Sequence, residues 1–180
     1  QLGGNLDLNS NNIDGTGNID ITGSVTASAN SEINGVSIGR GLGNVATNTV
    51  VGNNALDANT TGSNNTAIGD ESLSANTTGA QNVGIGAVSL NANISGNRNI
   101  GIGYQTLDAN TTGDDNVAVG KSALGANTTA DDNTAVGSSA LAINTTGASN
   151  TAVGANALDA NTTGSSNVAV GMNSLSVNTT

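Results

Sequence analysis

The sequence repeats every seventeen residues from Asn48 to Thr180, without an insertion or a deletion. We number each repeat from its leading residue, so that Asn stands at position 1, Gly at position 5, Leu at position 9 and a second Asn at position 12. A period this strict predicts that each repeat forms one coil of a stacked, quasi-one-dimensional solenoid. Eight repeats, of which the last is truncated, span residues 48–180.

The repeat at residues 150–166, NTAVGANALDANTTGSS, shows how one coil is expected to fold. Its β-branched residues at positions 2 and 4 flank a small residue, which predicts a short strand with the β-branched face turned inward. Gly154 is expected to end this strand with a positive φ or a close backbone contact. A second short strand is predicted through Leu158, Ala160 and Thr162. The Asn-Thr-Thr-Gly turn then closes the coil, with a permissive positive φ at its glycine.

Stacking places equivalent residues of all repeats in line along one axis. Strands of adjacent coils lie about 4.8 Å apart, so that eight coils extend for roughly 40 Å. The recurring Asn side chains are expected to form amide ladders, as in other stacked β-structures. The candidate structural positions, named in two of the repeats, are Asn65, Ile68, Gly69, Leu73, Asn76, Asn150, Val153, Gly154, Leu158 and Asn161.

The composition suits a thin structure better than a globular core. The chain has no Phe, Trp, Pro, Cys or His, and Tyr104 is its only aromatic residue. Aromatic side chains dominate the burial energy of ordinary cores, so association between chains is an expected source of stability. A net charge of −10 argues against binding to nucleic acid. No segment is apolar enough to predict membrane insertion.

The first forty-seven residues lie outside the period. Residues 1–30 alternate apolar and polar side chains between Asn and Gly, which predicts an N-terminal β-fibre shaft segment. Residues 31–47 are interpreted as an adaptor with a degenerate repeat. This interpretation depends on the GVSIG sequence at residues 35–39, which resembles the strand and glycine of one repeat.

Two sets of motifs resemble known fibre proteins. The motif N-[TV]-A-[VI]-G followed by small residues resembles the heads of trimeric autotransporter adhesins, whose usual repeat is somewhat shorter than this one. The form NTAVGxxALxANTTGxx is more similar to repeats of bacteriophage tail fibres, and the N-terminal LGGNLDLNSNNIDGTGNIDITGSV also resembles phage fibre sequences. This resemblance covers nearly the whole chain. It implies an all-β fold in which left-handed parallel β-rolls, or β-solenoids, assemble as a homotrimeric fibre.

The expected function is therefore mechanical. We expect a rigid, non-enzymatic shaft or head segment of a phage tail fibre, located in the virion and extracellular. Its expected partners are copies of itself, other tail proteins, and a host cell-surface receptor contacted through another region. One alternative is a bacterial trimeric surface adhesin, in which the roll itself binds host or matrix at the cell surface. A third is an ice-binding β-solenoid. The turn threonines argue against it, because neighbouring Thr residues point to opposite faces and leave only one regular row of Thr on a face.

One group of residues departs from the uniform repeat. Asp114 and Asp115 in one repeat are followed by Asp131 and Asp132 at the same two positions of the next. Four carboxylates at one corner are candidate ligands for a hard cation such as Ca²⁺, and the alternative is a solvated acidic turn. Catalysis is not expected, because sugar hydrolysis needs two carboxyl groups across a cleft and aromatic platforms for the substrate. No cofactor is predicted.

Three further side chains stand out near these acids. Lys121 lies half a coil away, where it can offset their charge, and Arg98 is expected to be similarly isolated. Surface ion pairs contribute little, so neither residue is assigned a function. Tyr104 follows a repeat glycine and is expected to be an exposed or interfacial aromatic residue.

Overall fold

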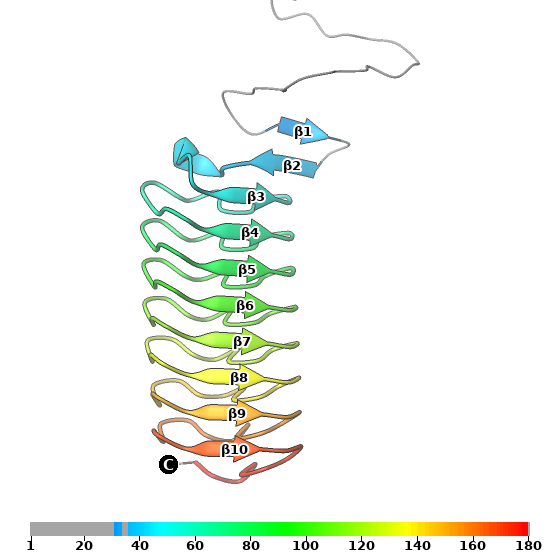
Figure 1. Cartoon of the computed structure of the whole chain (residues 1–180), viewed down its shortest axis with the longest axis vertical. Coiled ribbons are helices and arrows are strands. Elements are labelled where there is room, and N and C mark those ends of the chain that lie inside the picture. Colours follow the sequence, from blue (N-terminus) through cyan, green and yellow to red (C-terminus); the bar gives the residue numbers. More distant parts are fainter. Residues whose placement is uncertain (1–30, 34–35, 180) are drawn as a thin grey trace, which may run out of the picture.

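The structure is a computed structural model that describes residues 31–33 and 36–179. The predicted shaft segment at residues 1–30 lies outside the described residues. Within them the chain forms an all-β solenoid with one strand per coil, which confirms the predicted class of fold (Figure 1). The described residues contain no α-helix, only a short 3-10 helix.

A single sheet joins all ten described strands in chain order. From β3 to β10 the neighbours are parallel, and each residue pairs with its equivalent seventeen positions later, as Thr49 pairs with Thr66. Each of these strands has only three residues, because the glycine at position 5 follows directly. Their bounds are β3 Thr49–Val51, β4 Thr66–Ile68, β5 Val83–Ile85, β6 Ile100–Ile102, β7 Val117–Val119, β8 Thr134–Val136, β9 Thr151–Val153 and β10 Val168–Val170.

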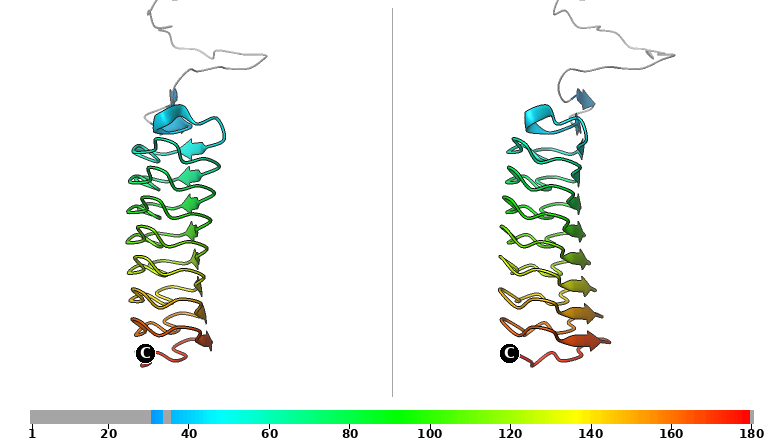
Figure 2. Two further views of the ribbon diagram at one scale, coloured as in Figure 1. Left: turned by 90° about the vertical axis from the view of Figure 1, so that its left-hand side faces the viewer. Right: turned by 60° about the vertical axis from the view of Figure 1, so that its left-hand side comes forward.

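The strands occupy one side of the column and the returning segments occupy the other (Figure 2). In Figure 1 the chain passes along each strand in front, returns behind it and moves down by one coil, which is a left-handed winding. All eight parallel strands therefore point in the same direction across one face of the column.

The strand face is oriented opposite to the prediction. The small residue at position 3 points into the coil, and Ala152 is fully buried. The β-branched residues at positions 2 and 4 point outward, and Val153 keeps 37% of its surface exposed. The expected inward β-branched face is thus wrong. The space beneath the sheet is small, so the inner position 3 holds Ala or Gly in seven of the eight coils and a larger residue, Val50, only in the first.

The predicted second strand is also absent from the described coils. Residues 158–160 form turns, and Leu158 has a left-handed φ of 54°. Adjacent coils nevertheless hydrogen-bond along this half, since Leu56 N donates to Ser72 O at 3.0 Å. The returning segment is therefore stacked, but it does not have extended strand geometry.

Leu at position 9 fills the centre of each coil. Leu56, Leu73 and their equivalents up to Leu158 are completely buried and form one line of side chains along the axis. The small residues at positions 3 and 8 complete the interior. Where Ser occupies position 8 of one coil, Gly occupies position 3 of the next: a Cβ on Gly84 would lie 2.5 Å from Ser72 Oγ.

Two ladders of buried Asn side chains flank this core, as predicted. At position 12, Asn93 Nδ2 donates to Asn76 Oδ1 at 2.8 Å and to Gly96 O at 3.0 Å. At position 1, the side-chain oxygen of Asn65 accepts from the backbone N of Asn82 at 2.9 Å. These amides pair the backbone groups of the tight turns, which would otherwise be buried without partners.

The two recurring glycines have different roles. Gly154, at position 5, has a φ of 133°, as predicted. The glycine of the Asn-Thr-Thr-Gly turn does not adopt the expected positive φ. It allows close approach instead, since a Cβ on Gly62 would lie 2.6 Å from Asn59 Oδ1. One coil accepts Ala130 at this position.

An antiparallel hairpin covers the first coil. β1 (Ser31–Ile33) pairs with β2 (Val36–Gly39), and β2 runs antiparallel to β3. The 3-10 helix η1 (Leu42–Asn44) follows, and Leu42 N donates to Leu56 O at 3.1 Å. The strand expected in this segment is present, but its reversed direction ends the parallel stack at β3.

Candidate interaction surface

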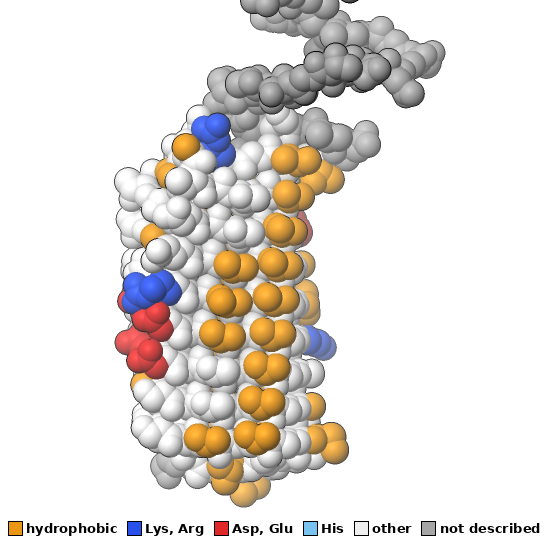
Figure 3. Space-filling view, viewed as in Figure 1, with side chains coloured by type: hydrophobic (Ala, Val, Ile, Leu, Met, Phe, Trp, Pro, Cys, Tyr) orange, Lys and Arg blue, Asp and Glu red, His pale blue; other side chains and the backbone are white. Residues whose placement is uncertain are grey.

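The outward strand face carries a continuous column of β-branched side chains. Position 4 lies at the last residue of each strand, and in every coil from β3 to β10 it holds Val or Ile. Figure 3 shows this column as an unbroken line of hydrophobic side chains along the solenoid. Its members are Val51, Ile68, Ile85, Ile102, Val119, Val136, Val153 and Val170.

A second column at position 2 is apolar only in part. It holds Val83, Ile100 and Val117 in β5 to β7 and Val168 in β10, whereas the other strands carry Thr. The apolar face is therefore two columns wide at β5 to β7 and again at β10 (Figure 3). Isolated exposed apolar side chains are ordinary on protein surfaces, but a contiguous patch marks an interaction site.

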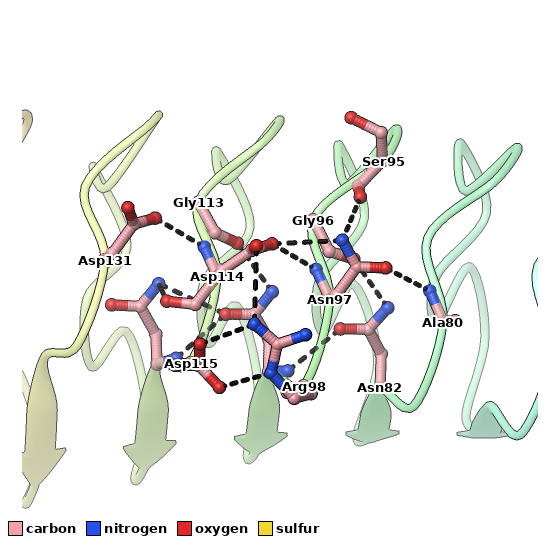
Figure 4. Close-up of polar contacts among 12 residues, drawn as sticks. Ala80, Asn82, Ser95, Gly96, Asn97, Arg98, Gly113, Asp114, Asp115 and Asp131 are labelled. Carbon is pink, nitrogen blue, oxygen red and sulfur yellow. Dashed lines mark hydrogen bonds and ion pairs between the residues drawn. The ribbon is translucent and has the colours of Figure 1, made fainter.

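A charged cluster lies beside this face, where the chain enters β6 and β7 (Figure 4). Arg98 donates to both carboxylate oxygens of Asp115, at 2.6 Å from Nε and 2.7 Å from Nη2, and its Nη2 lies 3.6 Å from Asp114 Oδ2. The hydrogen bond to Arg98 lowers the pKa of Asp115 and raises that of Arg98. Arg98 is thus paired, and the expectation that it is isolated is wrong.

The other acids of the cluster bind backbone amides of neighbouring coils. Asn97 N donates to Asp114 Oδ1 at 2.7 Å, and Asp114 N donates to Asp131 Oδ1 at 2.7 Å. Among the described residues no group of three or more acidic, His or Cys side chains is arranged to hold a metal ion. The candidate cation site at Asp114, Asp115, Asp131 and Asp132 gains no support from this arrangement.

Lys121 and Tyr104 lie on the opposite flank of the strand face. Lys121 follows β7 and Tyr104 follows β6, each directly after the glycine at position 5. Lys121 is exposed, and within the described part of the chain its side chain makes no ion pair. Tyr104 is 49% exposed. The expected compensation of the acids by Lys121 therefore does not occur within one chain.

Of the two threonine positions in each turn, only one forms a row of hydroxyl groups that are not used between coils, as expected. At position 13 the hydroxyl is used internally, since Thr111 Oγ1 donates to Thr128 O of the next coil at 3.0 Å. The neighbouring residue at position 14, such as Thr112, is exposed. A flat two-rank array of hydroxyl groups is thus not formed on this side.

The candidate structural positions fall into two groups. Asn65, Leu73, Asn76 and their equivalents lie inside the coil, whereas Ile68 and Val153 lie on the outer face. The outward direction had one signal in the sequence: position 3 never exceeds the size of Val, while position 2 accepts both Thr and Ile. Variation between polar and apolar residues is typical of a partly exposed position.

Comparisons with protein-family models, curated proteins and solved structures found no match to this chain. In the described part, no helix has the length and hydropathy needed to cross a membrane. The geometry of the strand face is therefore the feature from which a function can be argued.

Proposed function

We propose that this chain is a rigid, non-enzymatic segment of a homotrimeric fibre of the kind found in bacteriophage tail fibres, where it holds a receptor-binding tip away from the particle. The observation that carries the proposal is the column of Val and Ile along the outer strand face, from β3 to β10. A contiguous exposed apolar face of this kind marks an interaction site. In a closed oligomer, other copies of the chain cover this face.

Covering the strand face contributes favourable free energy to association. Ile102 and Val136 are 38% and 37% exposed in the single chain. Full burial of such a side chain contributes about 1.5–3 kcal/mol, so covering the exposed third contributes about 0.5–1 kcal/mol for each. These contributions add along the whole column, and three copies each supply one column.

The mechanical role follows from the hydrogen bonds along the axis. Strand pairing, the bonds of the returning segments and the two Asn ladders all connect one coil to the next. Bending the column requires breaking several of these bonds at once. A rod of this kind supports a binding module at its end without a hinge within its own length.

The test is the mass of the intact assembly, measured by light scattering after size exclusion. We expect three chains of 17.3 kDa each in one particle. Replacing Ile85 and Ile102 by Lys should produce smaller species, whereas the control Thr112→Lys, on the exposed turn, should leave the mass unchanged. A folded monomer for the unaltered chain contradicts the proposal and makes a single-chain solenoid, including the ice-binding kind, the next one to test by thermal hysteresis.

A bacterial surface adhesin remains the main rival, because it uses the same trimeric roll. The two proposals differ in where binding occurs. For the fibre segment we expect no binding of the isolated roll to host or matrix surfaces. Saturable binding of the trimer to a matrix protein would favour the adhesin.

A further inference from the structure

The strand face has two different flanks, because strands β3 to β10 all point in the same direction (Figure 1). Residues at positions 16 and 17 precede each strand and form what we call the leading flank. Residues at positions 6 and 7 follow each strand and form the trailing flank. When copies are related by rotation about the long axis, the leading flank of one copy lies beside the trailing flank of the next at the same height.

At the height of β7 the charges of the two flanks are complementary. The leading flank carries the acids at residues 114–115 and 131–132 with Arg98 as the neighbouring cation, so four negative charges and one positive charge leave −3. The trailing flank carries Lys121 directly after β7, exposed and without an ion pair to the residues described. Lys121 of an adjacent copy can therefore supply positive charge that partly balances these acids.

A second complementary pair lies one coil away, at β6. Arg98 lies on the leading flank, two residues before β6 begins, and Tyr104 lies on the trailing flank with half of its surface exposed. Arg98 uses Nε and Nη2 to bind Asp115, which leaves the flat face of the guanidinium group free. Arginine stacks on aromatic rings through this face, and such contacts are compatible with bidentate pairing in the plane.

The remaining acids of the trailing flank meet no like charge in this arrangement. Asp70 and Glu71 follow β4. The leading flank at this height consists of residues 63–64 and 80–81, which are Ser, Asn, Ala and Gln. A parallel, in-register assembly thus pairs its flank charges at β6 and β7 and avoids repulsion at β4.

We propose that copies of this chain associate in parallel and in register, with Lys121 of each copy bound to the acids beside β7 of the next and Tyr104 stacked on Arg98 of the next. This inference rests on the proposed homo-oligomeric rod, to which it adds direction, axial alignment and the residues that enforce them. The Val and Ile columns supply attraction but are nearly uniform along the axis. The flank residues supply the alignment that a uniform face lacks.

The test uses cysteine pairs, since the chain has no cysteine of its own. Ser149→Cys with Ala155→Cys places one thiol on each flank of β9, at the same height. The two positions are roughly 20 Å apart within one extended chain, so a disulfide between them joins two copies. The matched control, Ser138→Cys with Ser166→Cys, is offset by two coils, or about 10 Å, which exceeds the Cα separation of about 7 Å that a disulfide allows.

We expect mild oxidation to link the first pair into a covalent closed oligomer on a non-reducing gel and to leave the control pair unlinked. Adding Lys121→Glu to the first pair should reduce the linked fraction several-fold at low salt, because it places a fifth acid in the cluster. Combining Lys121→Glu with Asp132→Lys should restore it.

The outcomes separate this inference from the proposed rod. A multi-copy mass together with linking of the offset pair, or with full linking despite Lys121→Glu, overturns the inference and leaves the rod intact. A monomeric mass overturns both. Linking of the in-register pair that depends on Lys121 and returns with Asp132→Lys supports both.

Discussion

The interior of the coil is more polar, and its outer strand face more apolar, than in an ordinary globular protein. Inside, two ladders of Asn side chains are buried beside the Leu column. Outside, Val and Ile line the strand face, and Ile68, Ile102, Val136 and Val153 remain 37% to 38% exposed. A seventeen-residue coil leaves little volume beneath its sheet, and the backbone groups of its tight turns are paired by buried amides.

The hydrogen bonds of the stacked coils are satisfied within the chain, whereas the Val and Ile side chains of the strand face stay partly exposed. Under the proposed function, another copy of the chain covers this face. Comparable substitutions made inside and outside should therefore have different effects.

The largest difference is expected between two Gly→Ala substitutions. A Cβ on Gly86 would lie 2.7 Å from the backbone carbon of Gly103, and its φ of 130° is strained for any other residue. Gly86→Ala should lower the free energy of unfolding by about 4 kcal/mol or more. A Cβ on Gly125 would meet the flexible end of Asp108 at 3.3 Å and the backbone oxygen of Ser122 at 3.4 Å, so Gly125→Ala should change the free energy of unfolding by less than about 1 kcal/mol. Denaturant unfolding measures both; equal effects would mean that the coils are not stacked this closely.

Aliphatic truncation should also separate the two regions. Leu107 is completely buried, so Leu107→Ala should destabilise the chain by about 2–5 kcal/mol at any protein concentration. Ile102→Ala removes a side chain that is 38% exposed, and its main effect should be weaker association. Thermal unfolding over a hundredfold dilution series distinguishes the two. A concentration-independent loss for Ile102→Ala would remove the assembly role of the strand face.

Buried and exposed Asn residues provide a third comparison. Asn110 Nδ2 donates to Asn93 Oδ1 at 2.9 Å and to Gly113 O at 3.1 Å, so Asn110→Ala leaves buried polar groups unpaired. The expected loss is about 2–3 kcal/mol. Asn53→Ala removes only an exposed bond to Asp70 at 3.0 Å and should cost less than about 0.5 kcal/mol. Hydrogen exchange of the turn amides measures whether the ladder opens locally, and unchanged protection in Asn110→Ala would contradict its structural role.

The smallest effects concern two aspartates with opposite pKa shifts. The hydrogen bond to Arg98 lowers the pKa of Asp115 in the folded chain. Ionised Asp115 therefore stabilises the fold above its unfolded pKa of about 3.9. This contribution is lost as the pH falls through the lowered pKa of the folded state. Burial raises the pKa of Asp108, so its ionised form disfavours the fold as the pH rises through the raised folded value. At pH 7, Asp115→Asn should therefore destabilise slightly and Asp108→Asn should stabilise slightly. Both differences should vanish in strong acid, and stability curves of the two variants that show the same sign at pH 7 would contradict this assignment.

The sequence alone was sufficient to predict the solenoid, because a fixed period places equivalent residues of successive coils next to each other whatever the side chains are. It also predicted the Asn ladders, since identical amides seventeen residues apart must become neighbours. The direction of the strand face could not be predicted from alternation alone, because alternation separates two faces without saying which is inside. The volume of position 3, from Gly84 to Val50, contained that information.

Two local features required the structure. The returning segment has the alternation of a strand, but Leu158 adopts a left-handed φ that no propensity of leucine indicates. The pair Arg98 and Asp115 was not predicted, although the two residues are one period apart and stacking makes them neighbours. In a solenoid, the nearest neighbour of a side chain is its equivalent in the next coil.

The central claim is that the outer strand face is covered in the native assembly, and thiol accessibility tests it most directly. Val136→Cys places a single thiol on this face, where a single chain leaves the residue 37% exposed, and Thr129→Cys places one on the exposed turn as the matched control. Under native conditions we predict slow maleimide labelling at residue 136 and fast labelling at residue 129, with equal rates in denaturant. Equally fast labelling at both positions in the native protein would contradict the account.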